Sequence, residues 1–300
     1  MMSANLHTAL SQACANMGVI CRHVPSDGLW HLADLVNDAR GKGDGRIRLF
    51  PDGQGGIVAN NKAGTTQTFF VDSLRNLSAS EQFERQRIAA ELRAQSDRDQ
   101  AKRWALASDL ARGIFDVEKP CPGDHPYLVR KGVPAHPGFA RMDAPDPWGR
   151  VGSIVVPMRL SPHGFIQSLQ FITADGDKRF LAGGRKKGCF FELYQNTKPA
   201  APLFICEGLA TGLTIHQATG QTVFVAFDAG NLEPAARNLR QWYPTHEFVI
   251  AADNDCQTIG NPGLSYAKKA AAAIGASVML PPCDDGKARD WNDYAKEFGL

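Results

Sequence analysis

Three acidic residues in the last third of the chain have types and spacing that suit metal-dependent phosphate chemistry. Glu207 follows the apolar run at residues 203–206, and Asp253 and Asp255 follow another apolar run at residues 248–252. Carboxylate oxygens are hard ligands, which Mg²⁺ and Mn²⁺ prefer. Carboxylates that converge repel one another unless a cation lies between them. The three acids therefore predict a site for Mg²⁺ or Mn²⁺ that acts on phosphate groups.

The segments around these acids predict the elements that bring them together. Apolar runs at residues 203–206, 223–227 and 248–252 indicate buried strands. Helix-like segments lie between them, and one of these, residues 233–242, has Pro234 in its first turn. Alternating strands and helices of this length favour a parallel, doubly wound sheet. Ligands bind beyond the carboxyl ends of such strands, which is where the three acids stand.

Two further acids are candidates for the same site. Asp228 follows the predicted strand at 223–227, where it is able either to serve as a ligand or to cap the next helix. Asp290 belongs to the polar segment 287–293, which follows a last predicted strand at 277–280. Helix capping is the structural alternative for every acid at a strand end.

A dense basic cluster precedes the acids. It has five cations within ten positions, interleaved with glycines that permit close backbone approach: Lys178, Arg179, Arg185, Lys186 and Lys187. A charge run of this kind is usually a solvated loop. Its place directly before the acidic strand favours instead a surface that neutralises the phosphates of nucleotides and of a nucleic acid.

The chain before the basic cluster divides into parts of different composition. Residues 3–18 predict a short amphipathic helix, and the Gly-rich residues 41–68 predict a small antiparallel sheet without a Gly-Lys-Ser/Thr phosphate loop. A capping box of Ser78 and Glu81 opens one long charged helix to about Arg112. The Pro/Gly-rich segment 119–123 marks a boundary, and strands are expected at 154–156, 165–172 and 180–181.

The composition fits a well-packed core without extreme charge. Hydrophobic residues make up 43% of the 300, and the formal net charge is +2, so a nucleic-acid surface must be local. No apolar stretch approaches the roughly 18 residues of a membrane-spanning helix, and no signal-peptide pattern is found, so we expect a cytoplasmic protein without membrane contact. Seven cysteines without a Cys-x-x-Cys pair indicate reduced thiols. Cys14, Cys21 and His23 have the wrong spacing for a zinc ribbon, so no zinc is expected.

Several motifs resemble those of one enzyme family. A strand followed by Glu-Gly and a helix, and later a strand followed by Asp-x-Asp, resembles the Toprim domain of primases, of type IA and II topoisomerases and of some nucleases. Upstream, the chain is similar to the subdomain that precedes Toprim in bacterial replicative primases, through Tyr127, Leu128, Gly132, Pro157, Arg159, Gly164, Lys178, Phe180 and Leu181. The strings at 170–188, 207–211 and 227–232 resemble the primases of phages and plasmids in particular.

The resemblance, which covers about residues 120–300, implies a DNA primase that makes short primers on single-stranded DNA in plasmid or phage replication or in conjugative transfer. It implies that Glu207, Asp253 and Asp255 are catalytic and hold two Mg²⁺ or Mn²⁺ ions. The basic cluster, joined by Arg159, would bind nucleoside triphosphates and the template. A replicative helicase or a relaxase is an expected partner. Such primases usually begin with a zinc ribbon, which this sequence does not contain.

We therefore predict an α/β protein, α+β overall, whose Rossmann-like Toprim domain contains a parallel sheet. The expected parts are a small α+β region at 1–77, a long charged helix and linker at 78–118, a primase-like mixed α+β subdomain at 119–199 and the Toprim domain at 200–300. Two other functions stay open, a Toprim nuclease and a non-catalytic accessory that binds single-stranded DNA. A topoisomerase is not expected, because there is no room for the domains that carry its nucleophilic tyrosine.

Overall fold

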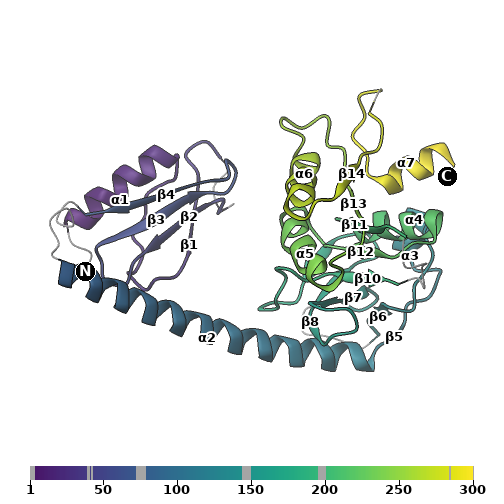
Figure 1. The fold of residues 1–300 in the computed structure, drawn as a ribbon, viewed down its shortest axis with the longest axis horizontal. Coiled ribbons are helices and arrows are strands. Elements are labelled where there is room, and N and C mark those ends of the chain that lie inside the picture. The colour runs from purple at the N-terminus through teal and green to yellow at the C-terminus, as the bar shows by residue number, and fades with distance from the viewer. Residues whose placement is uncertain are drawn as a thin grey trace. The chain divides into compact units, whose positions relative to one another are not determined.

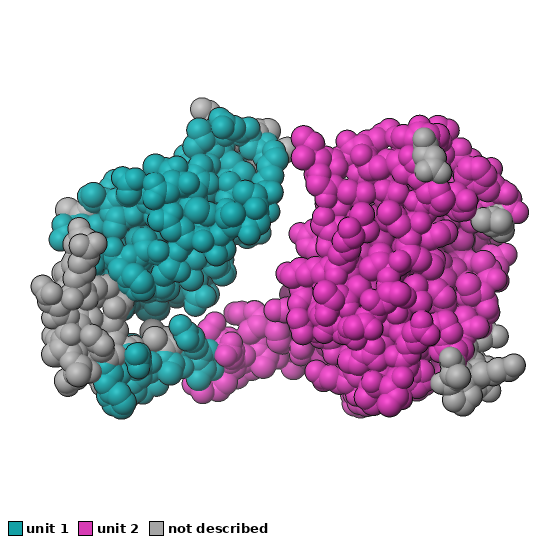
Figure 2. Space-filling model, turned by 45° about the horizontal axis from the view of Figure 1, so that its top comes forward, with its two compact units in different colours: residues 1–94 teal, residues 95–300 magenta. Residues whose placement is uncertain are grey.

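The computed structural model describes residues 4–38, 41, 43–71, 79–143, 150–194, 201–283 and 285–299. It divides into two compact units, residues 1–94 and 95–300, which are coloured separately in Figure 2. The capping box predicted from Ser78 and Glu81 lies outside the residues whose side chains are described. No helix in the described part of the chain is both long enough and apolar enough to cross a membrane.

The N-terminal unit has one helix on a four-stranded antiparallel sheet (Figure 1). Helix α1 (Ala4–Met17) ends before Gly18, whose φ of +63° suits glycine. The strands are neighbours in sequence order: β1 (His31–Ala33), β2 (Gly45–Leu49), β3 (Gly55–Asn60) and β4 (Thr65–Phe70). Ile47 and Val58 share one buried core with Leu10 of the helix. The predicted helix and the Gly-rich antiparallel sheet are thus confirmed.

Helix α2 (Ala79–Val117) runs for 39 residues through the segment in which the sequence predicts one long charged helix. Its C-terminal part packs through Ala111 on the first sheet of the second unit. Ser108 adds a hydrogen bond from its hydroxyl to the backbone carbonyl of Ile166 in that sheet. The apolar contacts of α2 with the sheet are therefore made near its C-terminal end.

The first sheet of the second unit is antiparallel. Its five strands are neighbours in sequence order: β5 (Lys119–Pro120), β6 (Ala140–Arg141), β7 (Ile154–Arg159), β8 (Ile166–Ile172) and β9 (Lys178–Phe180). Alternate residues of a strand point to opposite faces. Val155 accordingly joins the core beneath α2, whereas Ile154 and Val156 join the core shared with the short helix α3 (Pro126–Lys131). The sheet is thus buried on both faces.

The second sheet has the order β10-β12-β11-β13-β14, in which β10 (Phe191–Leu193) is antiparallel and the rest are parallel. The parallel strands are β11 (Leu203–Cys206), β12 (Val223–Val225), β13 (Phe248–Ala251) and β14 (Ser277–Met279). The helices that follow them are α4 (Leu209–Thr219), α5 (Ala229–Trp242), α6 (Pro262–Ile274) and α7 (Trp291–Phe298). The α/β prediction with a parallel sheet is confirmed.

Helices cover both faces of this second sheet, as Figure 1 shows. Phe204 and Cys206 of β11 lie in the same core as residues of α4, whereas Leu203 and Ile205 lie in the core lined by α5 and α6. Since neighbouring residues of β11 serve opposite faces, the whole strand has to be apolar. This is why the sequence shows an unbroken apolar run at 203–206.

Two local expectations are wrong. Helix α5 begins at Ala229 rather than at residue 233, because Oδ1 of Asp228 accepts a hydrogen bond from the backbone N–H of Asn231 (3.0 Å) and caps the helix early. Pro234 therefore lies inside the helix. Cys256 and Cys283 form a disulfide, so the expectation of reduced thiols fails for this pair. These two cysteines lie 27 positions apart in loops that meet only in the folded chain.

Close packing of α4 on β12 gives a stability prediction. A Cβ added at Gly212 would lie 2.7 Å from Cγ2 of Val225, which is closer than side chains pack. We expect Gly212→Ala to lower the free energy of unfolding by about 1–3 kcal/mol, as overpacked core positions do. Urea denaturation followed by circular dichroism measures this change.

Gly113 in α2 provides the control, because a Cβ added there would meet nothing within 4 Å. Gly113→Ala should raise the free energy of unfolding by about 0.4–1 kcal/mol, since alanine loses less backbone freedom on folding. If both variants shift the free energy of unfolding in the same direction, the prediction that α4 packs too closely on β12 to admit a Cβ at Gly212 is wrong.

Candidate functional site

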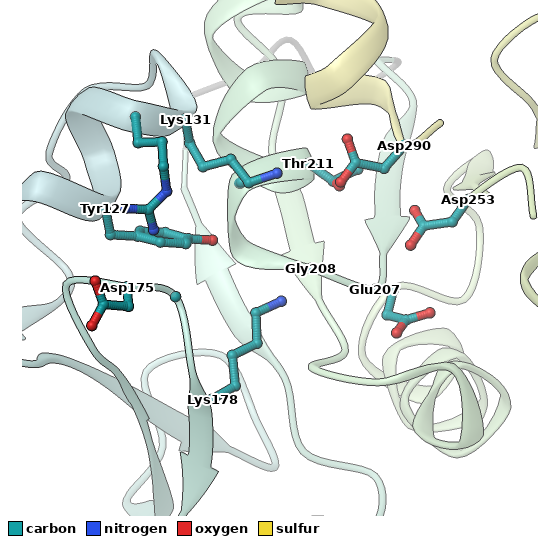
Figure 3. A pocket seen from close by; sticks show the side chains of 12 residues that line it. Tyr127, Lys131, Asp175, Lys178, Glu207, Gly208, Thr211, Asp253 and Asp290 are labelled. Atoms are coloured by element: carbon teal, nitrogen blue, oxygen red, sulfur yellow. The ribbon is translucent and has the colours of Figure 1, made fainter. Parts of the chain in front are cut away.

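A pocket of about 290 Å³ lies at the carboxyl ends of β11 and β13 (Figure 3). Its wall brings together acids and bases from elements that are far apart in the chain: Glu207, Asp253, Asp290, Arg130, Lys131 and Lys178. Figure 3 shows Asp253 and Asp290 reaching the pocket from one side and Lys178 from another. Groups of both signs thus face one small volume.

Glu207 is the first residue after β11 and precedes Gly208, the N-terminal cap residue of α4. Burial raises the pKa of its carboxyl group. Lys178 opposes this effect, whereas the charges of Asp228 and Asp255 add to it. A Cβ added at Gly208 would lie 3.6 Å from Nζ of Lys178, so the ammonium group reaches the turn beside Glu207.

Asp253 is the most perturbed acid of the pocket. Burial raises its pKa to about 7, and the charges of Glu207, Asp290 and Asp255 contribute in the same direction. Its Oδ1 atom is buried and has no hydrogen-bond partner among the described residues. Leaving a buried polar atom unsatisfied costs about 1–3 kcal/mol, and more for a charged group. Binding of a proton or a cation at this oxygen would therefore be favourable.

Asp255 has a different role in the structure from that of Asp253. Its Oδ2 atom accepts a hydrogen bond from the backbone N–H of Gly263 (2.9 Å) at the start of α6, and Asp255 is not part of the pocket wall. A Cβ added at Gly263 would lie 2.5 Å from the carbonyl oxygen of Asp253, so glycine is required where α6 approaches this loop. Asp255 thus anchors the loop while its charge acts on both Glu207 and Asp253.

Asp290 reaches the pocket through a backbone bridge. Asn254 and Arg289 pair as an isolated antiparallel bridge, with N–H to O distances of 2.8 and 3.1 Å. The buried Arg289 donates hydrogen bonds to Asp285 and Glu297, and these lower the pKa of both carboxyl groups. Asp290 then caps α7 through a hydrogen bond from the backbone N–H of Asp293. The segment that carries Asp290 is therefore held firmly beside Asp253.

The residues of the basic cluster do not all line one pocket. Lys178 lines the pocket, but Nζ of Lys186 lies 2.5 Å from Oδ2 of Asp228 and above the ring of Phe180. Asp228 is therefore ion-paired as well as capping α5. Arg185 and Lys187 line a separate pocket, and the exposed Arg179 lines neither.

Arg159 lies at the end of β7 and lines neither pocket, although its neighbours Leu160 and Ser161 line the second one. Its guanidinium donates a hydrogen bond to the carbonyl oxygen of Gly164, and burial lowers its pKa. Its backbone pairs with Phe190 and so connects the two sheets of this unit. The structure thus places Arg159 at a junction between sheets.

Three pocket residues, Tyr127, Arg130 and Lys131, were not among the predicted site residues. All three belong to α3, whose sequence signal was the Tyr-Leu pattern of the upstream subdomain. Burial, and after it the charge of Asp290, raises the pKa of Tyr127 to about 12. Its hydroxyl group therefore keeps its proton at neutral pH and is able to donate a hydrogen bond.

The oxygen ligands that these acids offer suit a divalent cation. The acids are not clustered around one point but lie apart in the pocket wall. Carboxylate oxygens suit Mg²⁺ and Mn²⁺, and the unpartnered Oδ1 of Asp253 is a ready donor. Within the described ranges, no group of three or more His, Cys, Asp or Glu side chains is arranged so that it could hold a metal ion. The acids are instead spread around the pocket, as in sites where water and substrate complete the coordination.

Comparisons with known proteins define the class of this domain. Residues 202–299 match the protein-family model described as Toprim domain, so this part of the chain is a Toprim domain, as its acidic motifs predict.

Two proteins named DNA primase TraC from Escherichia coli are similar to most of this chain. One is 32% identical over 89% of this chain and 19% of its own length, and the other is 30% identical over 96% of this chain and 27% of its own length. The chain thus spans less than a third of these relatives. Among solved structures, the Aquifex aeolicus primase (zinc binding and RNA polymerase domains) has a TM-score of 0.45 and 16% identity, covering 99% of this chain and 83% of that one.

The pKa of Asp253 gives a prediction about pH. Its value of about 7 in the folded protein exceeds the ordinary 3.8, so folding becomes less favourable as pH rises through this interval and changes no further above it. Asp253→Asn removes this penalty. In EDTA, the variant should be more stable than the parent by about 2–4 kcal/mol at pH 8, with the difference shrinking toward pH 4.

Urea denaturation between pH 4 and pH 8 measures this difference. Asp97→Asn, on an exposed part of α2, is the control and should give a difference that does not grow with pH. An Asp253→Asn protein that is less stable than the parent at pH 8 would show that the carboxylate is a structural cap.

Proposed function

We propose that this protein is a DNA primase that joins nucleoside triphosphates into short primers on single-stranded DNA. The observation that carries the proposal is the pocket of a Toprim domain in which partly buried acids, Asp253 above all, face Lys178 and the basic end of α3. Identity of about 30% to the TraC primases over most of the chain supports it. Plasmid or phage replication, or conjugative transfer, is the proposed setting, in the cytoplasm.

The proposed cofactor is Mg²⁺ or Mn²⁺. Glu207, Asp253 and Asp290 would hold it in the pocket, and Asp255 would contribute from the neighbouring loop. Such an ion supplies positive charge to the phosphate under attack and makes the attacking hydroxyl group more acidic. Asp228 is a weaker candidate ligand, because Lys186 already neutralises it.

The basic wall of the pocket would bind and orient the triphosphate. Lys178 supplies a charge beside Glu207, and Arg130 is held in place by a hydrogen bond to the carbonyl oxygen of Ala174 (2.8 Å). Tyr127 stays protonated and would donate a hydrogen bond to a phosphate oxygen. Donors that are fixed before the reaction stabilise developing charge without reorganising, which is the largest contribution in many enzymes.

The proposal extends to partners and to the division of the chain. Single-stranded DNA and nucleoside triphosphates are the substrates, and a replicative helicase or a relaxase is the proposed protein partner. Residues 1–77, 78–118, 119–199 and 200–300 are the proposed functional parts.

The activity is tested by incubating the protein with labelled nucleotides, Mg²⁺ or Mn²⁺ and a circular single-stranded template. Short labelled products are the expected result. Shortening of a linear single-stranded substrate without any labelled product would identify a nuclease. Absence of both, with the single strand still bound, would identify an accessory protein.

The acids should be required for this reaction. We expect Asp253→Asn and Glu207→Gln each to lower the rate of primer synthesis by about 100-fold or more, the usual effect of removing one group that stabilises the transition state. Asp97→Asn on α2 should keep full activity. Full activity of both pocket variants would show that these acids are scaffold.

Two lysines of the basic cluster should differ in effect. Lys178→Ala removes a charge from the pocket and should lower kcat/KM for nucleotides by about 10-fold to 100-fold, the value of a hydrogen bond to a charged group. Lys186→Ala is the matched variant, and its ammonium group is already paired with Asp228. It should change kcat/KM by less than about threefold. Equal effects in both variants would mean that the cluster acts as one surface.

A further inference from the structure

The second pocket of the C-terminal unit has about 730 Å³ of space and lies over helix α5. Its wall contains the cations Arg185, Lys187 and Arg237, together with the exposed aromatic ring of Trp242. It shares no lining residue with the acidic pocket. The volume lies within the range of about 300–1,000 Å³ that is usual for ligand sites.

The basic side of this pocket is fixed by two asparagines of α5. Asn231 accepts a hydrogen bond from the backbone N–H of Gly188 (2.8 Å) and donates to the carbonyl of Cys189 (2.9 Å). Asn238 donates to the carbonyls of Leu160 (2.6 Å) and Gly188 (2.9 Å). The loop that carries Arg185 and Lys187 is therefore attached to the helix that carries Trp242.

The arginine side chain in this loop is also held in place. The guanidinium of Arg185 lies 4.7 Å from the centre of the Trp104 ring, and its Nε donates to the carbonyl of Lys187 (3.4 Å). A cation stacked on an aromatic ring loses little freedom when it binds an anion. The loop thus presents Arg185 and Lys187 in a partly ordered state, which reduces the entropy cost of binding.

Positive charge exceeds negative charge around the pocket. Glu233 is the acid of its wall, and its carboxylate already pairs with Nε of Arg237 (2.9 Å) and Nζ of Lys269 (3.0 Å). Hydrogen bonds from these two cations lower the pKa of Glu233, which therefore stays ionised and neutralised. A single neutralised acid cannot form a metal site like the acidic pocket, so this pocket suits binding rather than phosphate chemistry.

We propose that this pocket, which we call the α5 groove, holds single-stranded nucleic acid outside the reaction centre. Arg185 and Lys187 contact phosphates, and one base stacks on Trp242. Cations beside an exposed aromatic ring are the combination by which proteins hold single strands without reading their sequence. The inference rests on the proposed function, because it assigns part of the basic cluster to the template or the new primer.

The test measures strand binding alone, with EDTA and without nucleotides, so that it is independent of catalysis. Fluorescence anisotropy of a labelled oligo(dT) is recorded over a series of salt concentrations. Arg185→Ala with Lys187→Ala should weaken binding at least tenfold, and it should lower the salt slope by about 0.7 for each phosphate that is no longer neutralised. Lys102→Ala with Lys268→Ala, which removes the same charge from exposed sites outside both pockets, should change binding less than threefold.

Trp242 provides an independent measurement. Trp242→Ala should weaken binding by about 5-fold to 150-fold, the usual contribution of one stacked base, without a change in salt slope. Trp242→Phe should restore most of the affinity, because a phenyl ring also stacks. Circular dichroism of each variant checks that it is folded.

The outcomes separate this inference from the proposed function. Weaker binding in the groove variants supports the groove even if the parent makes no primers, in which case the primase proposal fails alone. If the parent binds no single strand, or if the groove variants match the lysine control, the α5 groove is not a strand site.

Discussion

Parallel pairing of β11 with β13 is the constraint on which the site depends. In this register Cys206 lies beside Ala251, so the residues that follow the two strands leave the sheet at the same edge. Apolar side chains on both faces hold the register, because a slip of one residue would exchange the two buried faces. Glu207 and Asp253 are therefore neighbours although 46 positions separate them (253 minus 207).

The convergence of acids has an energetic cost that the rest of the unit has to offset. Burial, and after it repulsion by neighbouring acids, raises the pKa of both Glu207 and Asp253. The two hydrophobic cores around the second sheet, and the network of Arg289 with Asp285 and Glu297, stabilise the surroundings of these acids. The pocket is thus maintained by its scaffold rather than by its own contacts, as is usual where function requires clustered charge.

The residues of the basic cluster are close in sequence but face different parts of the fold. Lys178 lies on β9 and faces the acids, Lys186 neutralises Asp228, and Arg185 and Lys187 face the α5 groove. The backbone directly after Lys187 is attached to α5 by hydrogen bonds of the buried Asn231 amide with Gly188 and Cys189. Strand β9 therefore directs a cation to the acidic pocket, and the loop that follows it directs two cations to the α5 groove.

Local patterns in the sequence determined a large part of this protein. Apolar runs and helical periodicity identified the four parallel strands of the second sheet and the helices α4 and α5, but not β10, α6 or α7. The position of Glu207 and Asp253 at strand ends followed from the same patterns. These features are readable because burial on one or two faces imposes a period on the residues themselves. The early start of α5 was not predicted, because it depends on the hydrogen bond by which Asp228 caps the helix, and hydrophobic periodicity gives no information about such bonds.

Only the tertiary structure decided which charged groups meet. The bridge between Asn254 and Arg289 brings Asp290 to Asp253, and α3 adds Tyr127 and Arg130 from more than 70 positions upstream of Glu207. The disulfide of Cys256 with Cys283 has the same origin. Such contacts join loops that are far apart in the sequence, and their positions depend on strand register and helix length. The spacing of residues within one segment therefore does not predict them. The sequence therefore names the residues able to do chemistry, and the fold selects those that do it together.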